Sequence, residues 1–192
     1  MVEIRTERLR IRSLQPDDRP EFIRVRTVSA ELYSRWFPNQ EGTLEDIFDK
    51  EMEKAERALT SGTGFRMVGV RDDGSLAVFL NLSEIVRGVF QNAYASWSVA
   101  ADAQRQGFAT EGVAAMLDFA FSGIGAGLHR VQANIIPSNL ASLRLAERAG
   151  FRREGLAERY LNIAGEWQDH LMYAKTREEH SFRYAPFVAA DA

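Results

Sequence analysis

The chain has 192 residues, of which 45% are hydrophobic and 27% are charged, the balance of a single globular domain with its own apolar core. The formal net charge of -3 gives no sign of a generally basic, nucleic-acid-binding surface. The absence of cysteine excludes disulfides, thiolate metal sites and a cysteine nucleophile.

Neither a secretion signal nor a membrane span is expected. The segment from Met1 to Arg12 lacks the apolar stretch of a signal peptide. No apolar run approaches the ~20 residues that are needed to cross a bilayer. We therefore expect a cytoplasmic protein with no membrane partner and no direct nucleic-acid partner.

The N-terminal part is predicted to form one strand and two helices. Arg8 to Arg12 alternate charged and apolar residues, which is the pattern of a half-buried strand. Pro16-Asp17-Asp18 opens the first helical stretch. Thr43 and Asp46 resemble a capping box, and apolar residues recur at helical spacing from Leu44 to Leu59.

Three strands and a helix are predicted next. Phe65 to Val70 and Leu76 to Val86 are rich in β-forming residues and are separated by Asp72-Asp73-Gly74, a hairpin turn signal. Ala93 to Val99 is the third strand. Phe108 to Phe121 carries an apolar stripe and is predicted to be a helix.

The remaining elements are a strand, a helix and a hairpin. His129 to Ile136 is predicted as the strand. Asn139 to Ala149 is predicted as a helix with Asn139 as its N-cap and Gly150 as its stop. Tyr160 to Ile163 and Trp167 to Lys175 form the hairpin. The whole order predicts an α/β (α+β) chain around a mixed sheet, with residues 1–176 as one domain and 177–192 as a C-terminal tail.

The most informative segment joins a predicted strand to a predicted helix over residues 99–110. Free N–H groups at such a junction favour an anion. Gly107 can take a positive φ angle and lets a ligand approach the backbone, Arg105 supplies a cation, and Ala109 is small. A pyrophosphate suits this chemistry, although an ordinary exposed connection explains the same residues. No Gly-Lys-Ser/Thr follows, so the segment is not a Walker loop.

These residues resemble a known family. Gln104 to Ala109 are similar to the Q/R-x-x-G-x-G/A signature of GNAT acetyltransferases, and Pro137 to Ser142 with Glu147 to Phe151 resemble the RimJ/RimL branch. Asn81 to Gly88 and Tyr160 to His170 are similar to RimJ-type ribosomal-protein-alanine N-acetyltransferases. The resemblance extends from about residue 6 to 175 and is weak between 16 and 62.

The resemblance implies a GNAT fold, with a mixed, mostly antiparallel sheet of about six to seven strands and about four helices. It implies acetyl-CoA as cosubstrate, no metal, and direct transfer of the acetyl group to an amine without an acyl-enzyme. The residues implied in CoA binding are Ser98, Val99, Gln104, Arg105, Gln106, Gly107, Phe108, Ala109, Thr110, Asn139 and Ser142.

The implied catalytic residues are fewer. Ser142 would lie in the first turn of its helix, where a hydroxyl can protonate or stabilise the departing thiolate; a serine there can equally satisfy local backbone groups. The tyrosine that many family members use as general acid is replaced by Ala146. The general base is Glu84, Glu158 or an ordered water.

Other polar and aromatic residues carry weaker expectations. His129 and His170 are expected to make structural hydrogen bonds, and no spacing of His, Asp and Glu suggests a metal. Trp36-Phe37-Pro38 either lines an acceptor groove or belongs to the core.

The leading functional hypothesis is transfer of acetyl to the N-terminal amino group, alanine above all, of a protein such as a ribosomal protein. The alternatives are an acetyltransferase of a small amine or antibiotic (an aminoglycoside or a polyamine) and a non-catalytic CoA-binding protein. The sequence leaves open whether the chain forms a homodimer.

Overall fold

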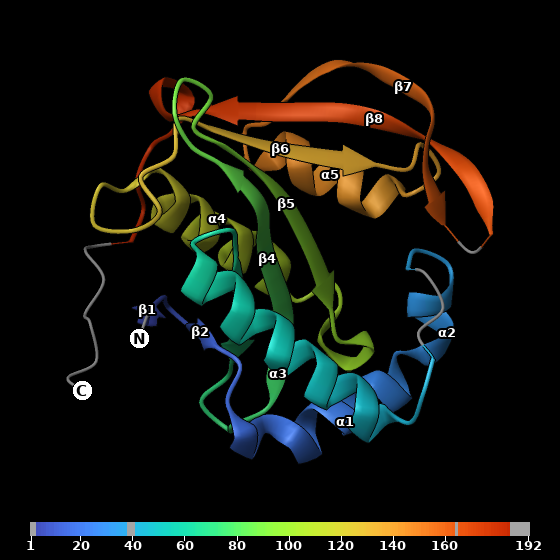
Figure 1. Cartoon of the computed structure of the whole chain (residues 1–192). Coiled ribbons are helices and arrows are strands. Elements are labelled where there is room, and N and C mark those ends of the chain that lie inside the picture. Colours follow the sequence, from blue (N-terminus) through green and yellow to red (C-terminus); the bar gives the residue numbers. More distant parts are fainter. Residues whose placement is uncertain (1–2, 38–40, 164, 185–192) are drawn as a thin grey trace.

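The computed structural model describes residues 3–37, 41–163 and 165–184, and eight strands in these ranges form one sheet (Figure 1). The order across the sheet is β1-β2-β3-β4-β5-β6-β8-β7. Only β5 and β6 pair in parallel, so the mixed and mostly antiparallel sheet is confirmed. The strands are β1 (Glu3–Arg5), β2 (Arg10–Ser13), β3 (Phe65–Val70), β4 (Leu76–Val86), β5 (Asn92–Val99), β6 (Arg130–Ile135), β7 (Arg152–Ile163) and β8 (Glu166–Thr176).

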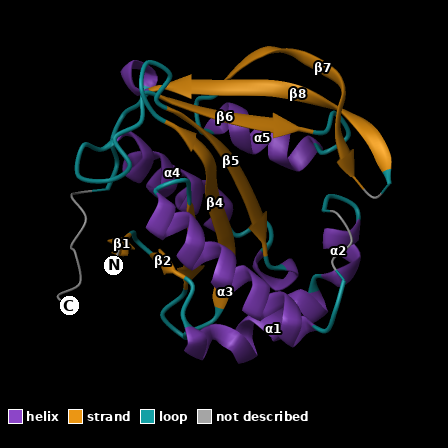
Figure 2. Cartoon of the chain, viewed as in Figure 1, coloured by secondary structure: helices purple, strands orange, loops and turns teal. Residues whose placement is uncertain are grey.

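Helices cover both faces of the sheet (Figure 2). The α-helices are α1 (Arg19–Val28), α2 (Ala30–Ser34), α3 (Leu44–Ser61), α4 (Phe108–Phe121) and α5 (Leu140–Arg148), and the 3-10 turns are η1 (Pro16–Asp18), η2 (Ala101–Ala103) and η3 (Arg177–Glu179). Helices α4 and α5 pack on one face, and α1 and α3 pack on the other.

Alternation along β4 shows how the two faces are divided. Val78 and Leu80 point toward α4, where Gly112 allows close approach: an added Cβ would lie 3.0 Å from Val78 and 3.3 Å from Leu80. Phe79, between them in sequence, points to the opposite face and meets the ring of Phe22 on α1 at 5.8 Å between centroids. The buried side chains on both faces form the core.

Local sequence signals set the ends of the helices. The Thr43 side chain accepts from the N–H of Asp46, whose carboxylate accepts in turn from the N–H of Thr43, so the predicted capping box begins α3. Asn139 caps α5 as predicted, and Gly150 follows α5 with a φ of 82°.

The predicted final hairpin is longer than expected on its first side. Strand β7 begins at Arg152 instead of Tyr160 and pairs with β8 at the edge of the sheet. Its register shifts between Arg153 and Gly155 and again between Ala157 and Leu161. Because of these irregularities and the mostly exposed side chains, the sequence of β7 lacks the alternation of apolar and polar residues that marks a strand.

Residues 177–184, from the segment assigned as a C-terminal tail, pack against α4. The Asp118 carboxylate is fully buried and accepts from the backbone N–H groups of Arg183 and Tyr184. The Nε2 atom of His180 lies 2.6 Å from the same carboxylate. This buried contact joins the described end of the chain to the middle of the domain.

Candidate active site

A gap between the two parallel strands is the central feature of the candidate site. Strands β5 and β6 pair only from Asn92 to Tyr94 and from Arg130 to Gln132. Beyond these residues β5 runs on to Val99 while β6 continues paired with β8 only, so the two strands diverge (Figure 1). The edge of β5 that faces β6 over residues 95–99 therefore has main-chain groups without a partner strand.

The junction that follows β5 is held by the N-terminal helices. The Tyr33 hydroxyl on α2 donates to the Val99 carbonyl at 3.1 Å. Arg24 on α1 forms an ion pair with Asp102 at 2.6 Å between Nη1 and Oδ2. These contacts fix the end of β5 relative to α1 and α2, so the predicted phosphate-binding segment does not depend on local structure alone.

The predicted phosphate-binding segment leads directly into α4. Gly107 caps the helix with a φ of 87°, and Arg105 takes a left-handed φ of 60°. Residues 104–107 are exposed. The first N–H groups of α4 have no partner within the helix, and the positive end of the helix dipole lies at the same place. The segment thus has the geometry of an anion site.

The ion pair between Arg8 and Glu111, which we call the brace, holds this segment in place. The Glu111 side chain is 6% exposed and accepts from the Arg8 N–H at 2.7 Å, from Arg8 Nε at 2.8 Å and from the Thr6 hydroxyl at 2.5 Å. Arg8 Nη1 donates to the Gln106 carbonyl at 2.8 Å, and its guanidinium lies 4.6 Å from the ring centroid of Phe108.

The contacts of the brace also lower the pKa of Glu111. Burial by itself raises the pKa of Glu111, but hydrogen bonds from Thr6 and Arg8 outweigh it and hold the pKa below its ordinary value. No local sequence pattern predicts this contact, because Arg8 and Glu111 lie 103 residues apart.

Asn139 and Ser142 lie at the start of α5, which packs on β6. The Asn139 carbonyl oxygen accepts from the Ser142 N–H at 3.1 Å. The Ser142 side chain is half-buried in the first turn of the helix, as the spacing predicted. Ala146, which stands where the family resemblance implies a tyrosine, is fully buried.

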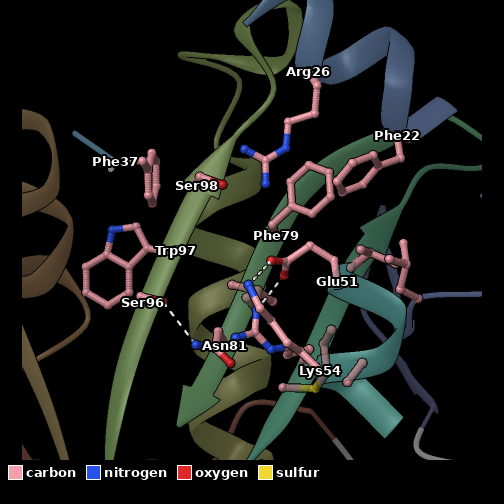
Figure 3. Close-up of a pocket in the computed structure, with 16 residues that line it drawn as sticks. Phe22, Arg26, Phe37, Glu51, Lys54, Phe79, Asn81, Ser96, Trp97 and Ser98 are labelled. Atoms are coloured by element: carbon pink, nitrogen blue, oxygen red, sulfur yellow. Dashed lines mark hydrogen bonds and ion pairs between the residues drawn. The ribbon is translucent and has the colours of Figure 1, made fainter. Parts of the chain in front are cut away.

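A cavity of about 290 Å³ opens on the other face of the sheet, between the N-terminal helices and β3, β4 and β5 (Figure 3). Its polar lining includes Asn81 on β4 and Ser96 and Ser98 on β5, so the strand that borders the gap also borders this cavity. Phe37 lines the cavity, whereas Trp36 is not among the lining residues and Pro38 lies outside the described residues.

One carboxylate in the cavity is fully engaged by cations. Glu51 on α3 lies 2.5 Å from Arg66 Nη1 on β3 and 3.1 Å from Lys54 Nζ (Figure 3). Its side chain is 13% exposed. No sequence motif marks the contact between Glu51 and Arg66, because it joins a helix to a strand.

The two predicted bases differ in their surroundings. Glu84 lies at an irregularity of β4 with a φ of 50°, and its charge acts on Tyr160 of β7. Burial, with Tyr94 and Glu84 nearby, raises the pKa of Tyr160, whose hydroxyl accepts from Asn134 Nδ2 at 3.2 Å. Glu158 is exposed in the irregular part of β7.

The histidines make structural contacts. His170 is 3% exposed, packs against the Tyr160 ring at 5.6 Å and contacts the Gln168 carbonyl through Nδ1 at 3.0 Å. His129 pairs with Glu178 at 3.1 Å on the surface. Within the described ranges, no group of three or more His, Cys, Asp or Glu residues is arranged to hold a metal ion. No helix in those ranges is both long enough and apolar enough to cross a membrane.

A model of the acetyltransferase (GNAT) domain matches residues 8–152. The chain therefore belongs to the GNAT acetyltransferase family, and its eight-stranded open sheet, split between β5 and β6, is a GNAT fold.

Two curated relatives are similar to part of the chain. The [ribosomal protein uS5]-alanine N-acetyltransferase of Escherichia coli is 34% identical over 105 residues, covering 55% of this chain and 53% of that protein. The probable N-acetyltransferase YjcK of Bacillus subtilis is 36% identical over 102 residues, covering 53% of this chain and 55% of that protein. The chain thus spans about half the length of these curated relatives.

A solved structure matches over a longer range. RimJ from Mycobacterium smegmatis, in complex with CoA-disulfide, has a TM-score of 0.82 and 26% identity, covering 93% of this chain and 86% of that chain. The likeness of fold therefore extends beyond the segment of clear sequence similarity.

Proposed function

We propose that the chain is an acetyl-CoA-dependent N-acetyltransferase whose acceptor is the N-terminal amino group, alanine above all, of a protein such as a ribosomal protein. The observation that carries the proposal is the position of β5. One edge of this strand borders the gap beside the N-terminal end of α4, and its side chains line a separate cavity. A donor and an acceptor can therefore meet across one strand. The choice of acceptor is supported by the likeness to the E. coli enzyme.

In this proposal residues 104–110 bind the CoA pyrophosphate through main-chain N–H groups. The pantetheine arm runs along β5 beside Ser98 and Val99, where N–H groups point alternately to β4 and into the gap. Asn139 and Ser142 contact the arm near its sulfur from the start of α5. Arg8 and Glu111 act as positioning residues, because they hold the Gln106 carbonyl and α4 in place.

The chemistry needs a neutral amine, a stabilised oxyanion and a protonated leaving group. The amine attacks the thioester carbonyl, and a main-chain N–H of β5 donates to the oxyanion. The carbon–sulfur bond then breaks, and the CoA thiolate takes a proton from Ser142 or from a water that Ser142 holds. We assign removal of the amine proton to Glu84, directly or through water, because its charge acts on Tyr160, whose hydroxyl accepts from Asn134 on β6, the strand across the gap from β5.

Binding of the cosubstrate is tested at the phosphate-binding segment. Gly107→Asp places a negative charge at the helix end, and Gly74→Asp is the matched control, since Gly74 has a φ of 86° in a turn with nothing near its Cβ position. Calorimetry with acetyl-CoA should show at least about tenfold weaker binding for Gly107→Asp only, the loss expected from one charge-assisted contact. Equal affinity in the two variants would remove residues 104–110 from the binding site.

Catalysis is tested with a thiol-release assay on alanine-starting peptides and on a panel of small amines. Turnover of the peptides supports the proposed acceptor, and turnover of small amines alone overturns it. Ser142→Ala should lower kcat while the affinity for acetyl-CoA is largely kept. Glu84→Gln should lower kcat/KM, with Glu158→Gln as the control; unchanged rates in both would leave water as the base.

A further inference from the structure

Arg26 lines the cavity and forms no ion pair with the described residues. It extends from α1 into the cavity, as Figure 3 shows. Its Nε atom is buried and makes no hydrogen bond within the described parts of the chain. The guanidinium lies over the rings of Phe22 and Tyr33, at 5.1 Å and 5.4 Å from their centroids. The rings hold the guanidinium in place but supply no hydrogen-bond acceptor for its edge.

Within the described residues no carboxylate forms an ion pair with Arg26, although the charge of Glu51 favours its charged form. Burial is the main reason that the pKa of Arg26 lies below its ordinary value. The carboxylate that lines the cavity, Glu51, is already bound by Arg66 and Lys54. The described lining therefore holds more positive than negative charge, although the whole chain has a net charge of -3.

An unpaired, partly desolvated guanidinium favours a carboxylate or phosphate oxygen over any other partner. A cavity of this charge repels a polycation, and it attracts an amine that also carries an anion. The anion must be close to the amine, because Arg26 and Ser98 of β5 line the same cavity of about 290 Å³.

We propose that Arg26 binds an anionic group of the acceptor, so that the preferred acceptor is a peptide N-terminus with an acidic side chain within its first few residues. The inference rests on the proposed function, since it assigns the cavity to the acceptor. It makes Arg26 a specificity-determining residue, while the donor site, at the edge of β5 that borders the gap, is independent of it.

The test compares two alanine-starting peptides that have aspartate or asparagine at the third position and are otherwise identical. Binding to the CoA-loaded protein is measured by calorimetry for wild type, Arg26→Gln, Arg26→Lys and Arg57→Gln. Arg57 is the matched control because it is an exposed cation, 71% exposed, that pairs with Glu53 on α3. Acetyl-CoA affinity and the unfolding temperature are measured for each variant, so that a folding defect is recognised.

Wild type should bind the aspartate peptide about tenfold more tightly than the asparagine peptide. The preference should vanish in Arg26→Gln, persist in part in Arg26→Lys and remain in Arg57→Gln. Equal binding of the two peptides by wild type, or a preference that survives in Arg26→Gln, overturns the inference while leaving the proposed function standing.

The two proposals fail in distinguishable ways. If only small amines are acetylated, the proposed function is wrong, and γ-aminobutyrate is then compared with its amide in the same four proteins. A preference for the carboxylate that depends on Arg26 supports the inference on its own. Preference for spermidine over both compounds, unchanged in Arg26→Gln, contradicts it.

Discussion

Removal of the Glu111 carboxylate should destabilise the domain and also loosen the predicted phosphate-binding segment, residues 104–110. In Glu111→Ala the Arg8 N–H loses its acceptor in a partly buried place, which costs about 1–3 kcal/mol. The Thr6 hydroxyl can still donate to the Leu9 carbonyl, and the Arg8 side chain, 47% exposed, can return to water, so the ion pair itself adds only about 1 kcal/mol. The total loss is about 2–4 kcal/mol.

That loss corresponds to an unfolding temperature lower by about 5–15 °C for a chain of this size, measured by circular dichroism. Glu56→Ala is the control, because Glu56 is exposed on α3 and its substitution should change stability by less than about 0.5 kcal/mol. An equal unfolding temperature for the two variants would show that the brace contributes nothing.

The pH dependence gives an independent check on the same carboxylate. The folded-state pKa of Glu111 lies below the ordinary value of 4.5, so its stabilising contribution is complete above that pH and is lost as the pH falls through the folded-state pKa. The difference in unfolding temperature between wild type and Glu111→Ala should therefore be largest near neutrality and shrink below pH 4.5. A difference that stays constant into the acid range would refute this explanation.

Two further substitutions test contacts at the start of α5 and at the C-terminal end of the described chain. Asn139→Ala removes the N-cap of α5 and should cost about 1 kcal/mol in urea unfolding, whereas Asn139→Asp keeps an acceptor for the Ser142 N–H and should lose far less. Asp118→Asn weakens the buried contacts to His180 and to the N–H groups of Arg183 and Tyr184, so proteolysis within residues 177–184 should become several-fold faster. Unchanged cleavage would show that the segment is held by its other contacts.

The parts of the fold that the sequence predicted well depend on contacts between near neighbours. The bounds of β3, β4 and α4 agree with their apolar patterns, because each of these elements is largely buried and consists mostly of apolar residues. The capping box of α3 closes within four residues. Strand β7 was predicted only in part, since its edge position and shifted register remove the periodic burial on which such a prediction rests.

The residues of the candidate site also fall into two groups, those in local segments and those brought together by the fold. Residues 104–110 are contiguous, and the start of α5 is a local structure, so both could be recognised from sequence. The brace between Arg8 and Glu111 and the contact between Glu51 and Arg66 join separate elements, and no local pattern marks them. Their roles follow only from the folded chain.

The difference between local segments and contacts across elements suggests how the acceptor can vary while the fold stays the same. The proposed donor side consists of one segment and two helix ends, where main-chain groups would bind acetyl-CoA and many side chains are compatible with that role. The proposed acceptor cavity is lined by side chains from α1, α3, β3, β4 and β5, so one substitution there changes its charge without disturbing the donor side. If Arg26 selects the acceptor, sequence similarity along residues 104–110 carries information about acetyl-CoA and almost none about the amine.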